Sequence, residues 1–357
     1  MLPASLPQST GAVFYVSTSG SDANPGTLAA PWATVQKALN TLLPGQTALV
    51  RAGTYSANLV MNRAGTATAP ITVKNYPGER PVLQPASSAP TYAIRITKGA
   101  AWFRLHGFVI QNAPSGYDNI WISDGQDYTS RYPTHDIEIS GNEIRNGLWT
   151  GLLVSPNVYN AEIIGNYVHN NGDWVSQHHG LYIQGQHCLV ADNVVAHHYG
   201  FGIQVRGNYP DSDTATRIAA TGNLITNNTV TDSQTYSGIL VENNAQQTTI
   251  VNNITAYNGS YGVRGYYNGD GEWLSGNKAF GNLSYGNGSG NYGDTQGTII
   301  DYSGGNLLAN PLFVDRTGSN FHLQSGSPAI GVGLAPYAPL FDMDGNLRSP
   351  APDVGAY

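Results

Sequence analysis

Between Gly141 and Tyr267 the sequence repeats one pattern five times: GNEIRNGLWTGLLV (141–154), GNYVHNNGDWVSQHHGLYI (165–183), DNVVAHHYGFGIQV (192–205), NNTVTDSQTYSGILV (227–241) and NNITAYNGSYGVRGYY (252–267). Each copy has a marker asparagine near its start and a marker glycine before a run of alternating apolar residues. These markers are Asn142, Asn166, Asn193, Asn228 and Asn253, and Gly151, Gly180, Gly202, Gly238 and Gly262. Successive marker asparagines are 24, 27, 35 and 25 residues apart. A unit of this size buries its apolar face only by stacking on its neighbours, so the pattern predicts a solenoid.

Each copy is predicted to form a coil of short strands rather than a pair of helices. The apolar runs are three to five residues long, rich in β-branched residues and bounded by glycine and asparagine, as in strands. A helical repeat would instead place apolar residues at i, i+3, i+4 and i+7. The marker asparagines recur once per coil, so we expect them to form a structural ladder of side-chain amide hydrogen bonds at a buried turn.

The composition fits a soluble protein with many turns and excludes several functional classes. Apolar residues make up 40% of the 357 residues, which argues against disorder, and 43 are glycine. The net charge of −7 and the lack of Lys/Arg clusters argue against nucleic acid as the partner. The single cysteine, Cys188, forms no internal disulfide and is predicted to be a buried thiol.

The two ends of the chain lack the repeat and are predicted to close it. Residues 13–27 read as a strand and a turn, and residues 31–46 as an amphipathic helix with Val35, Ala38, Leu39 and Leu42 on one face. This helix would cover the exposed strand edges of the first coil. We expect the C-terminal segment to fold back over the other end.

Both ends resemble the secreted right-handed parallel β-helix proteins of the pectate-lyase-like superfamily, which include polysaccharide lyases and related glycosidases. The N-terminal resemblance lies in FYVSTSGSDANPGT (14–27), APWATVQKAL (30–39), PGQTALVRAGTY (44–55) and GTATAPITVKNYPGERPVL (65–83). The C-terminal resemblance lies in NPLFVD (310–315), FHLQSGSPAIGVG (321–333) and FDMDGNLRSPAPDVGAY (341–357). The resemblance implies an all-β, right-handed parallel β-helix with an N-terminal capping helix. It also implies one domain over 1–357, with the strand and cap helix at 13–46, coils at 47–290, and C-terminal coils and cap at 291–357.

Strand alternation predicts which side chains point outward from the coils. The first and third residues after each marker glycine should point inward, and the second and fourth outward. Two outward columns result: Trp121, Leu153, Tyr182, Gln204, Leu240 and Arg264, and beside them Ser123, Ser155, Gln184, Arg206, Glu242 and Tyr266. Irregular insertions flank these columns, and insertions in a solenoid commonly build the binding face. We therefore predict a site on residues 118–128, 173–184, 204–213 and 236–267.

This mixture of aromatic, amide and charged side chains suits a sugar polymer. The resemblance implies β-elimination in a uronic-acid polymer, for which Arg206 or Arg264 would neutralise the substrate carboxylate. His178 would be the base and Tyr182 the acid, since a proton next to a carboxylate is removed only if the developing charge is stabilised. The residues predicted to bind substrate are Trp121, Trp149, Trp174, Gln184, Gln204, Tyr209, Tyr236, Arg264 and Tyr266.

Two other functions remain as alternatives. A glycoside hydrolase needs two carboxyl groups, and Glu242 would pair with Asp173, Asp211, Asp213 or Asp232. A non-catalytic carbohydrate-binding solenoid would use the same face without turnover. The Arg206 and Glu242 pair could equally be a surface ion pair that contributes little energy. The outward columns contain no lysine base, and the Asp-Pro-His signature of mannuronan C5-epimerases is missing from the sequence.

Six histidines fall within two coils: His169, His178, His179, His187, His197 and His198. His179 is predicted to pack inward, which turns His178 outward beside Tyr182. His197 and His198 are expected to be solvated or bonded within a turn. Adjacent histidines do not have the spacing of a known metal site. We therefore assign no metal ligand and no cofactor, with Ca²⁺ kept as an alternative that the resemblance suggests.

We expect a monomer that binds a polysaccharide rather than nucleic acid or a membrane. No apolar run is long enough to span a bilayer. The resemblance implies secretion, and the chain begins without a charged and apolar leader, so a signal peptide would have been removed already.

Overall fold

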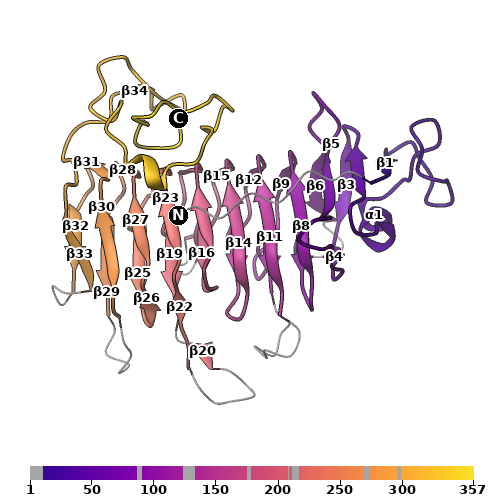
Figure 1. Ribbon diagram of the computed structural model, residues 1–357, viewed down its shortest axis with the longest axis horizontal. Helices are drawn as coiled ribbons and strands as arrows, with labels where there is room; N and C mark the ends of the chain where they lie inside the picture. Colours follow the sequence, from indigo (N-terminus) through magenta and orange to yellow (C-terminus); the bar gives the residue numbers. More distant parts are fainter. Residues whose placement is uncertain are drawn as a thin grey trace.

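The computed structural model describes residues 11–86, 91–123, 133–174, 178–207, 209–210, 217–267, 274–295 and 299–357. Short parallel strands stack into an elongated solenoid with three long sheets along its sides (Figure 1). Successive strands pass from sheet A to sheet B to sheet C and back to sheet A one rung further on. The structure confirms the predicted right-handed parallel β-helix, in agreement with the right-handed preference of parallel crossovers.

Sheet A contains, in spatial order, β1 (Val13–Val16), β2 (Thr47–Val50), β5 (Ile71–Asn75), β8 (Ala101–His106), β11 (His135–Ser140), β14 (Tyr159–Ile164), β17 (Leu189–Ala191), β23 (Leu224–Thr226), β27 (Thr249–Val251), β30 (Asn277–Phe280) and β33 (Ile300–Gly304). Sheet B contains β3 (Thr54–Ala57), β6 (Val82–Pro85), β9 (Val109–Gln111), β12 (Glu143–Arg145), β15 (Tyr167–His169), β18 (Val194–Ala196), β24 (Thr229–Thr231), β28 (Ile254–Ala256) and β31 (Leu283–Tyr285). Sheet C contains β4 (Leu59–Met61), β7 (Ile94–Ile96), β10 (Ile120–Ile122), β13 (Leu152–Val154), β16 (Leu181–Ile183), β19 (Ile203–Arg206), β25 (Ile239–Glu242), β29 (Tyr261–Tyr266) and β32 (Gly290–Asp294).

Three small two-stranded sheets complete the strand inventory of the described chain. They are β20 (Tyr209–Pro210) with β21 (Arg217–Ile218), β22 (Ala220–Thr221) with β26 (Ala245–Gln246), and β34 (Phe313–Asp315) with β35 (Asn320–Leu323).

The interior of the solenoid is a continuous apolar core. The residues predicted to point inward from sheet C are fully buried: Leu152, Val154, Leu181, Ile183, Ile203, Val205, Ile239 and Val241. Residues two apart on a strand share a face, so burial of this set turns the intervening side chains outward. The marker glycines therefore predicted the orientation of sheet C correctly.

The marker asparagines form the predicted ladder at the corner between sheets A and B. Asn142 Nδ2 donates to Asn166 Oδ1 over 3.1 Å, and Asn166 Nδ2 donates to Asn193 Oδ1 over 3.0 Å. The ladder continues through Asn228 and Asn253. Each oxygen also accepts the backbone N–H of the preceding asparagine, as Asn193 Oδ1 does from Asn166 over 2.9 Å. A buried amide left without partners costs about 1–3 kcal/mol, so the ladder holds neighbouring coils in register.

A second ladder, which we did not predict, includes a histidine. Asn258 Nδ2 donates to Asn287 Oδ1 over 2.9 Å, and Asn119 Nδ2 donates to Asn171 Oδ1 over 3.0 Å. Next in this column, His198 Nδ1 accepts the backbone N–H of Asn171 over 3.2 Å. His198 is fully buried, and burial lowers its pKa to about 3, so the ring is neutral. The expectation of a solvated or turn-bonded His198 is wrong, because its ring takes the place of a ladder amide.

The predicted N-terminal helix is present and shorter than the stretch that suggested it. Helix α1 (Val35–Thr41) packs against β1 and β4 at the end of the solenoid (Figure 1). Thr34 caps it by accepting the backbone N–H of Lys37 over 3.1 Å, and the buried side chains of Val35, Ala38 and Leu39 face the first coil. Within the described part of the chain, no helix is long and apolar enough to cross a membrane.

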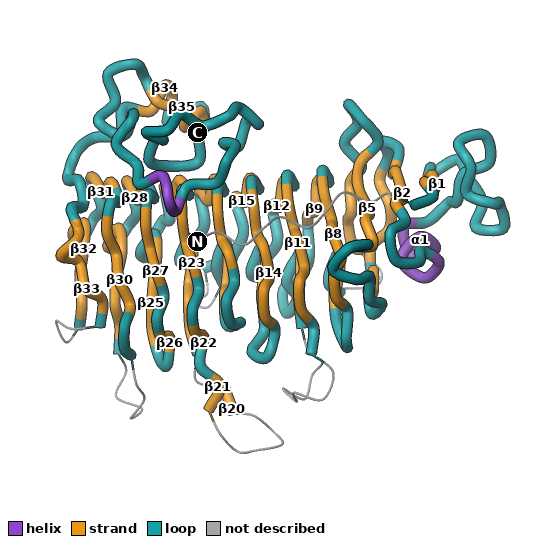
Figure 2. The backbone as a smooth tube through the Cα atoms, viewed as in Figure 1, coloured by secondary structure: helices purple, strands orange, loops and turns teal. Residues whose placement is uncertain are grey.

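The C-terminal segment, residues 305–357, lies along the side of the coils rather than over their end (Figure 2). It contains β34, β35 and the short 3-10 helix η1 (Ala335–Tyr337). Its Phe313, Phe321 and Val354 pack with Val194 and Ile254 of sheet B. The outer face of sheet B is thus apolar at β18, β28 and β31, and covering this part explains why the segment folds back where it does. Sheet C keeps an outer face to which this segment adds no strand.

Cys188 is a buried free thiol, as predicted. It is 1% exposed, and burial raises its pKa to about 12, so it stays protonated and unreactive.

Candidate active site on the outer face of sheet C

Strand pairing aligns both predicted columns on the outer face of sheet C. In the first column Trp121 is paired with Leu153, Leu153 with Tyr182, and Tyr182 with Gln204. Gln204 is then paired with Leu240, and Leu240 with Arg264. In the second column Arg206 is paired with Glu242 and Glu242 with Tyr266. Paired strands lie about 4.8 Å apart, so neighbouring members of a column can touch one ligand.

The centre of this face is a polar cluster around Glu242. Gln204 Nε2 donates a hydrogen bond to Glu242 Oε1, and Arg206 Nε lies 3.7 Å from the same oxygen. The Glu242 side chain is only 10% exposed, whereas that of Arg206 is 28% exposed. Burial raises the pKa of Glu242, although Arg206, Gln204 and Arg264 all favour its ionised form. Gln204 Oε1 is buried without a hydrogen-bond partner, so it can accept a hydrogen bond from a ligand.

His178 lies elsewhere than predicted. We expected it to point outward beside Tyr182, but it is 6% exposed and its ring centroid lies 4.9 Å from that of Trp149. Its Nδ1 lies 2.6 Å from Asp173 Oδ1. Burial lowers the pKa of His178, whereas the hydrogen bond that its ring donates to Asp173 raises it. The difference arises because His178 occupies the corner before sheet C, where the two-residue alternation of a strand does not hold.

The ring beside Tyr182 belongs to His179. The two rings meet edge to face at 5.2 Å, and His179 Nδ1 accepts the backbone N–H of Phe201 over 3.3 Å. His179 is 2% exposed, so its predicted burial is confirmed. Burial, and to a smaller extent the charges of His178, His198 and Arg206, lower its pKa to about 3.

Aromatic side chains surround the arginine at the far end of the face. The Arg264 guanidinium lies 5.4 Å from the ring of Tyr261 and 5.1 Å from that of Tyr266. Tyr236 packs on Phe201 at 4.9 Å. The predicted substrate-binding residues Arg264 and Tyr266 therefore lie beside the central cluster, where cation–π contacts orient the guanidinium.

Sequence reasoning missed a cationic and aromatic group at the near end of the face. Arg95 of β7 is paired with Trp121, and its guanidinium lies 5.9 Å from the Trp121 ring. Trp121 stacks on Tyr92 at 4.8 Å and donates from Nε1 to Ser155 Oγ over 2.7 Å. Arg95 Nε is buried without a hydrogen-bond partner. The signal was in the sequence, since the IRI strand at 94–96 has one outward residue at the rung before Trp121.

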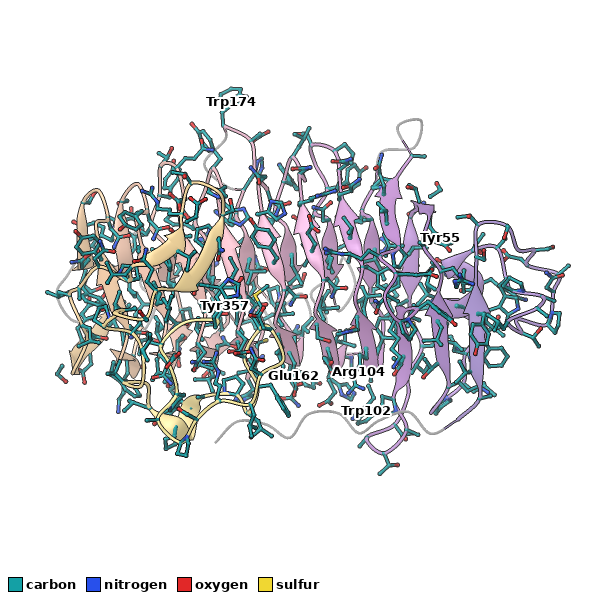
Figure 3. The ribbon with its side chains drawn as sticks, turned by 90° about the horizontal axis from the view of Figure 1, so that it is seen from above. Tyr55, Trp102, Arg104, Glu162, Trp174 and Tyr357 are labelled. Atoms are coloured by element: carbon teal, nitrogen blue, oxygen red, sulfur yellow. The ribbon has the colours of Figure 1, made fainter. Side chains whose placement is uncertain are left out.

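The remaining predicted residues have varied surroundings. Trp149 packs on His178, and Gln184 is buried at 5% exposure. Trp174 is 79% exposed and projects from one long edge of the molecule (Figure 3). The side chain of Tyr209 lies outside the described residues, as do parts of the predicted loops, 124–132, 175–177, 208 and 211–216.

Of the four carboxyl groups proposed to pair with Glu242 in hydrolysis, the two that the structure describes bind other residues. Asp173 is bound to His178, and Asp232 forms an ion pair with Arg316 of the C-terminal segment. Asp211 and Asp213 lie outside the described residues. Among the residues that the structure describes, no group of three or more His, Cys, Asp or Glu side chains could hold a metal ion.

The sequence and the fold were compared with those of known proteins. A family model described as "Pel9A-like, right handed beta helix region" matches residues 14–293. The chain is 37% identical over 82 residues to pectate lyase PEL9 of Emericella nidulans, a match that covers 22% of this chain and 20% of that protein. The matched stretch spans about a fifth of the length of the curated relatives.

Two solved structures share the fold. Pectate lyase Pel9A superposes with a TM-score of 0.64 at 18% identity, covering 98% of this chain and 97% of that chain. A GH136 lacto-N-biosidase from Eubacterium ramulus superposes with a TM-score of 0.55 at 15% identity, covering 83% of this chain and 67% of that chain. The fold is therefore shared by a lyase and a glycoside hydrolase.

Proposed function

This chain belongs to the family of Pel9A-like right-handed β-helix proteins, and from that premise we propose that it cleaves a uronic-acid-containing polysaccharide by β-elimination. The reaction would take place on the outer face of sheet C, outside the cell, where such polymers occur. The observation that carries the proposal is the alternation of cationic and aromatic side chains along this face. Arg206 and Arg264 lie among Tyr182, Gln204 and Tyr266 at the spacing of one coil.

Arg206 is proposed to bind the carboxylate of the sugar unit that reacts. A guanidinium pairs with a carboxylate through two parallel hydrogen bonds, which neutralises the charge as the proton next to the carboxylate is lost. The Arg206 side chain is 28% exposed, so part of its guanidinium is accessible to a substrate carboxylate. Glu242 then acts as a positioning residue for Arg206 and Gln204.

His178 is proposed to take the C5 proton. Asp173 at 2.6 Å favours the tautomer with hydrogen on Nδ1, which leaves the Nε2 lone pair as the base. The electrons of the C5–H bond form the C4–C5 double bond while the C4–O bond breaks. Tyr182 would donate its proton to the departing oxygen. The His178 side chain is only 7% exposed, so the sugar must fit closely against it and Trp149.

The test is a single assay with two readouts. The protein is incubated with a panel of acidic and neutral polysaccharides while the ultraviolet absorbance of unsaturated products and the number of reducing ends are followed. β-Elimination predicts that both signals rise together, with acidic polymers only. Cleavage of neutral polymers alone, or no cleavage of any acidic polymer, would contradict the proposal.

Hydrolysis is the second candidate because one observation favours it. The raised pKa of the buried Glu242 suits a general acid that must carry a proton at neutral pH. A second carboxyl group would have to come from the flanking loops. New reducing ends without the absorbance of an unsaturated product would identify this reaction, and polymer binding with neither signal would identify a binding solenoid.

A further inference from the structure

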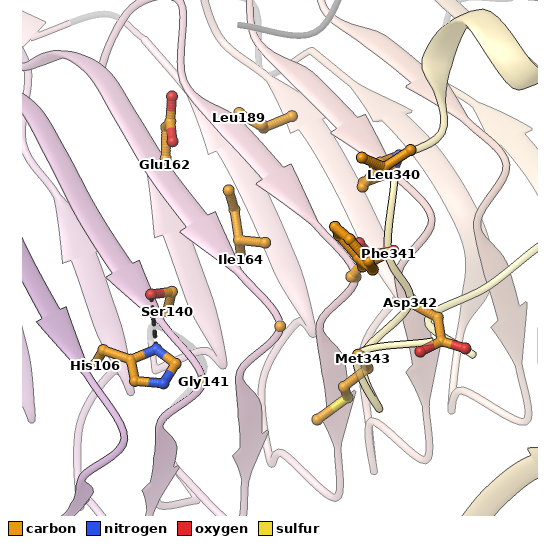
Figure 4. A pocket seen from close by; sticks show the side chains of 14 residues that line it. His106, Ser140, Gly141, Glu162, Ile164, Leu189, Leu340, Phe341, Asp342 and Met343 are labelled. Carbon is orange, nitrogen blue, oxygen red and sulfur yellow. Dashed lines mark hydrogen bonds between the residues drawn. The ribbon is translucent and has the colours of Figure 1, made fainter. Parts of the chain in front are cut away.

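A groove of about 490 Å³ lies on the outer face of sheet A, away from the candidate active site (Figure 4). Its floor is formed by strands β8, β11, β14 and β17, and its wall by residues 339–345 of the C-terminal segment. The side chains that matter are Glu162, Ile164 and Leu189 on the floor, and Leu340, Phe341 and Met343 on the wall. This volume is that of a small-molecule site, which is typically about 300–1,000 Å³.

Glu162 is a buried carboxyl group with one oxygen that lacks a hydrogen-bond partner. It is 8% exposed, and its Oε2 has no hydrogen-bond partner. The neighbouring Glu138 has two partners, because Arg104 Nε donates to its Oε2 over 2.6 Å and Ser140 Oγ donates to its Oε1 over 2.7 Å. Burial and the charge of Glu138 raise the pKa of Glu162 to about 7. A buried acceptor without a donor destabilises the protein, and a ligand hydroxyl that donates to it would remove that cost.

The wall opposite Glu162 is apolar, exposed and held in place. Phe341 is 51% exposed and Leu340 is 66% exposed, although neither lies at the end of the chain. Met343 donates its backbone N–H to Ala356 over 2.9 Å. The buried ion pair between Arg348 and Asp192, at 2.8 Å, fixes the same segment to the coils. Phe341 is thus presented to the groove by a rigid support.

We propose that this groove binds a neutral sugar unit, with a hydroxyl group donating to Glu162 and an apolar ring face lying against Phe341. Both features are needed to recognise a sugar, which has hydroxyl groups at its rim and C–H groups on its faces. An acidic sugar would be disfavoured, since Glu162, Asp192 and Asp342 line the groove and Arg348 is already paired with Asp192. The site is separate from the proposed elimination site and does not depend on that assignment.

The test is ligand-observed NMR and calorimetry with neutral sugars, galactose, xylose and their short oligomers, and with galacturonic acid for comparison. The full chain should bind at least one neutral sugar and should bind galacturonic acid more weakly than galactose. Glu162→Leu, which removes the acceptor, and Phe341→Ala, which removes the ring, should each weaken binding at least tenfold. Glu143→Gln is the matched control, because Glu143 is a carboxylate on β12 outside the groove.

Each outcome of this test either supports or overturns the proposal. Circular dichroism first establishes that both variants are folded, and a third variant, Leu340→Ala, should weaken binding without touching the carboxyl group. Equal affinity in the wild type and all three variants would overturn the site. Absence of binding to any neutral sugar, or tighter binding of galacturonic acid, would overturn the ligand class. Arg206→Gln should retain sugar binding in the groove whatever its effect on polymer cleavage, so failure of one proposal leaves the other intact.

Discussion

The outer faces of sheets C and A are built by the same coils and carry opposite chemistry. On sheet C the described residues include three arginines, Arg95, Arg206 and Arg264, with the carboxyl group of Glu242 among them. On sheet A, Arg104 is bound to Glu138, and one carboxyl oxygen of Glu162 has no hydrogen-bond partner. The repeat dictates only the spacing of side chains, so each face is free to acquire its own ligand. One scaffold can thus present a cationic track on one side and an acidic groove on another.

Substitution of His178 should have the largest effect on activity, and it should affect the sheet C site without affecting the sheet A groove. His178→Gln keeps a side chain of similar size but removes the base, so elimination should fall by about 10²–10⁴-fold. Binding of neutral sugar to the sheet A groove should not change. Initial rates of unsaturated product report the first effect and calorimetry the second. His197→Gln is the control, because His197 bonds Ser319 of the C-terminal segment, and a rate for His178→Gln equal to that of this control would remove His178 from the mechanism.

Arg206 offers the next largest effect. Arg206→Gln should lower kcat/KM on acidic polymers by about 10²-fold, since it removes a donor aimed at the developing charge. Arg206→Lys should restore part of the rate, because the charge returns without the planar pair of hydrogen bonds. The control is Arg316→Gln, which removes the partner of Asp232 outside the face. If Arg206→Gln and Arg316→Gln had the same activity, the sheet C face would not be the cationic track.

The acidic face should reveal itself through the pH dependence of stability. The pKa of Glu162 is raised from 4.5 to about 7, so the native state keeps a proton that the unfolded chain releases as the pH rises through this window. The free energy of unfolding should therefore fall between about pH 4.5 and pH 7, by at most about 3 kcal/mol. Glu162→Gln cannot titrate and should lack this fall, as urea denaturation at several pH values would show.

For Glu143, the free energy of unfolding should change with pH in the opposite direction, which the same denaturation experiment can measure. Its hydrogen bond with His169, and then the charges of Arg145 and Arg80, lower its pKa. The stability that this carboxylate contributes is present above its ordinary pKa and is lost as the pH falls through the lowered value. Glu143→Gln should therefore lose stability relative to the wild type at neutral pH. If the free energy of unfolding varied with pH in the same way for the wild type, Glu162→Gln and Glu143→Gln, the opposite pKa shifts of Glu162 and Glu143 would be contradicted.

The smallest expected effect concerns Arg95 and would show how far along the outer face of sheet C the polymer binds. Arg95 lies four rungs from Arg206, about 19 Å along the stack. A contact so far from the reacting bond contributes uniform binding, so Arg95→Gln should raise KM on long polymers by about two- to fivefold with kcat unchanged. Short oligomers that do not reach this rung should be cleaved as by the wild type. An unchanged KM on long polymers would place Arg95 outside the track.

Most of the fold could be predicted because every coil has the same local sequence pattern, so the structure inferred for one coil applies to the others. The marker glycine fixed the orientation of Leu152 and Val154, and every later coil followed it. The second ladder could have been found in the same way. Asn171, His198, Ser233 and Asn258 each follow a marker asparagine by five residues. We read His198 as a turn residue because its neighbours in sequence, and not its counterparts in other coils, guided the interpretation.

The sites were harder to predict because they depend on contacts outside the repeat. The position of His178 is set by Asp173 and Trp149 at a corner, where strand alternation gives no direction. The sheet A groove needs Phe341, which lies far along the chain from Glu162 in a segment without periodicity. The column of Arg206 and Glu242, in contrast, follows from alternation alone and was predicted correctly.

The asparagine ladder keeps successive coils at a constant spacing, whatever the number of residues in each coil. The side-chain hydrogen bonds that join successive marker asparagines measure 3.1, 3.0, 2.9 and 2.9 Å, although these asparagines are 24, 27, 35 and 25 residues apart in the sequence. Extra residues in the longest coil are accommodated beyond β19 without moving the next rung. Loops along that edge can therefore be lengthened, exchanged or grafted from another protein while the stack itself remains unaltered. New polymer preferences could arise by such exchange with little risk to folding.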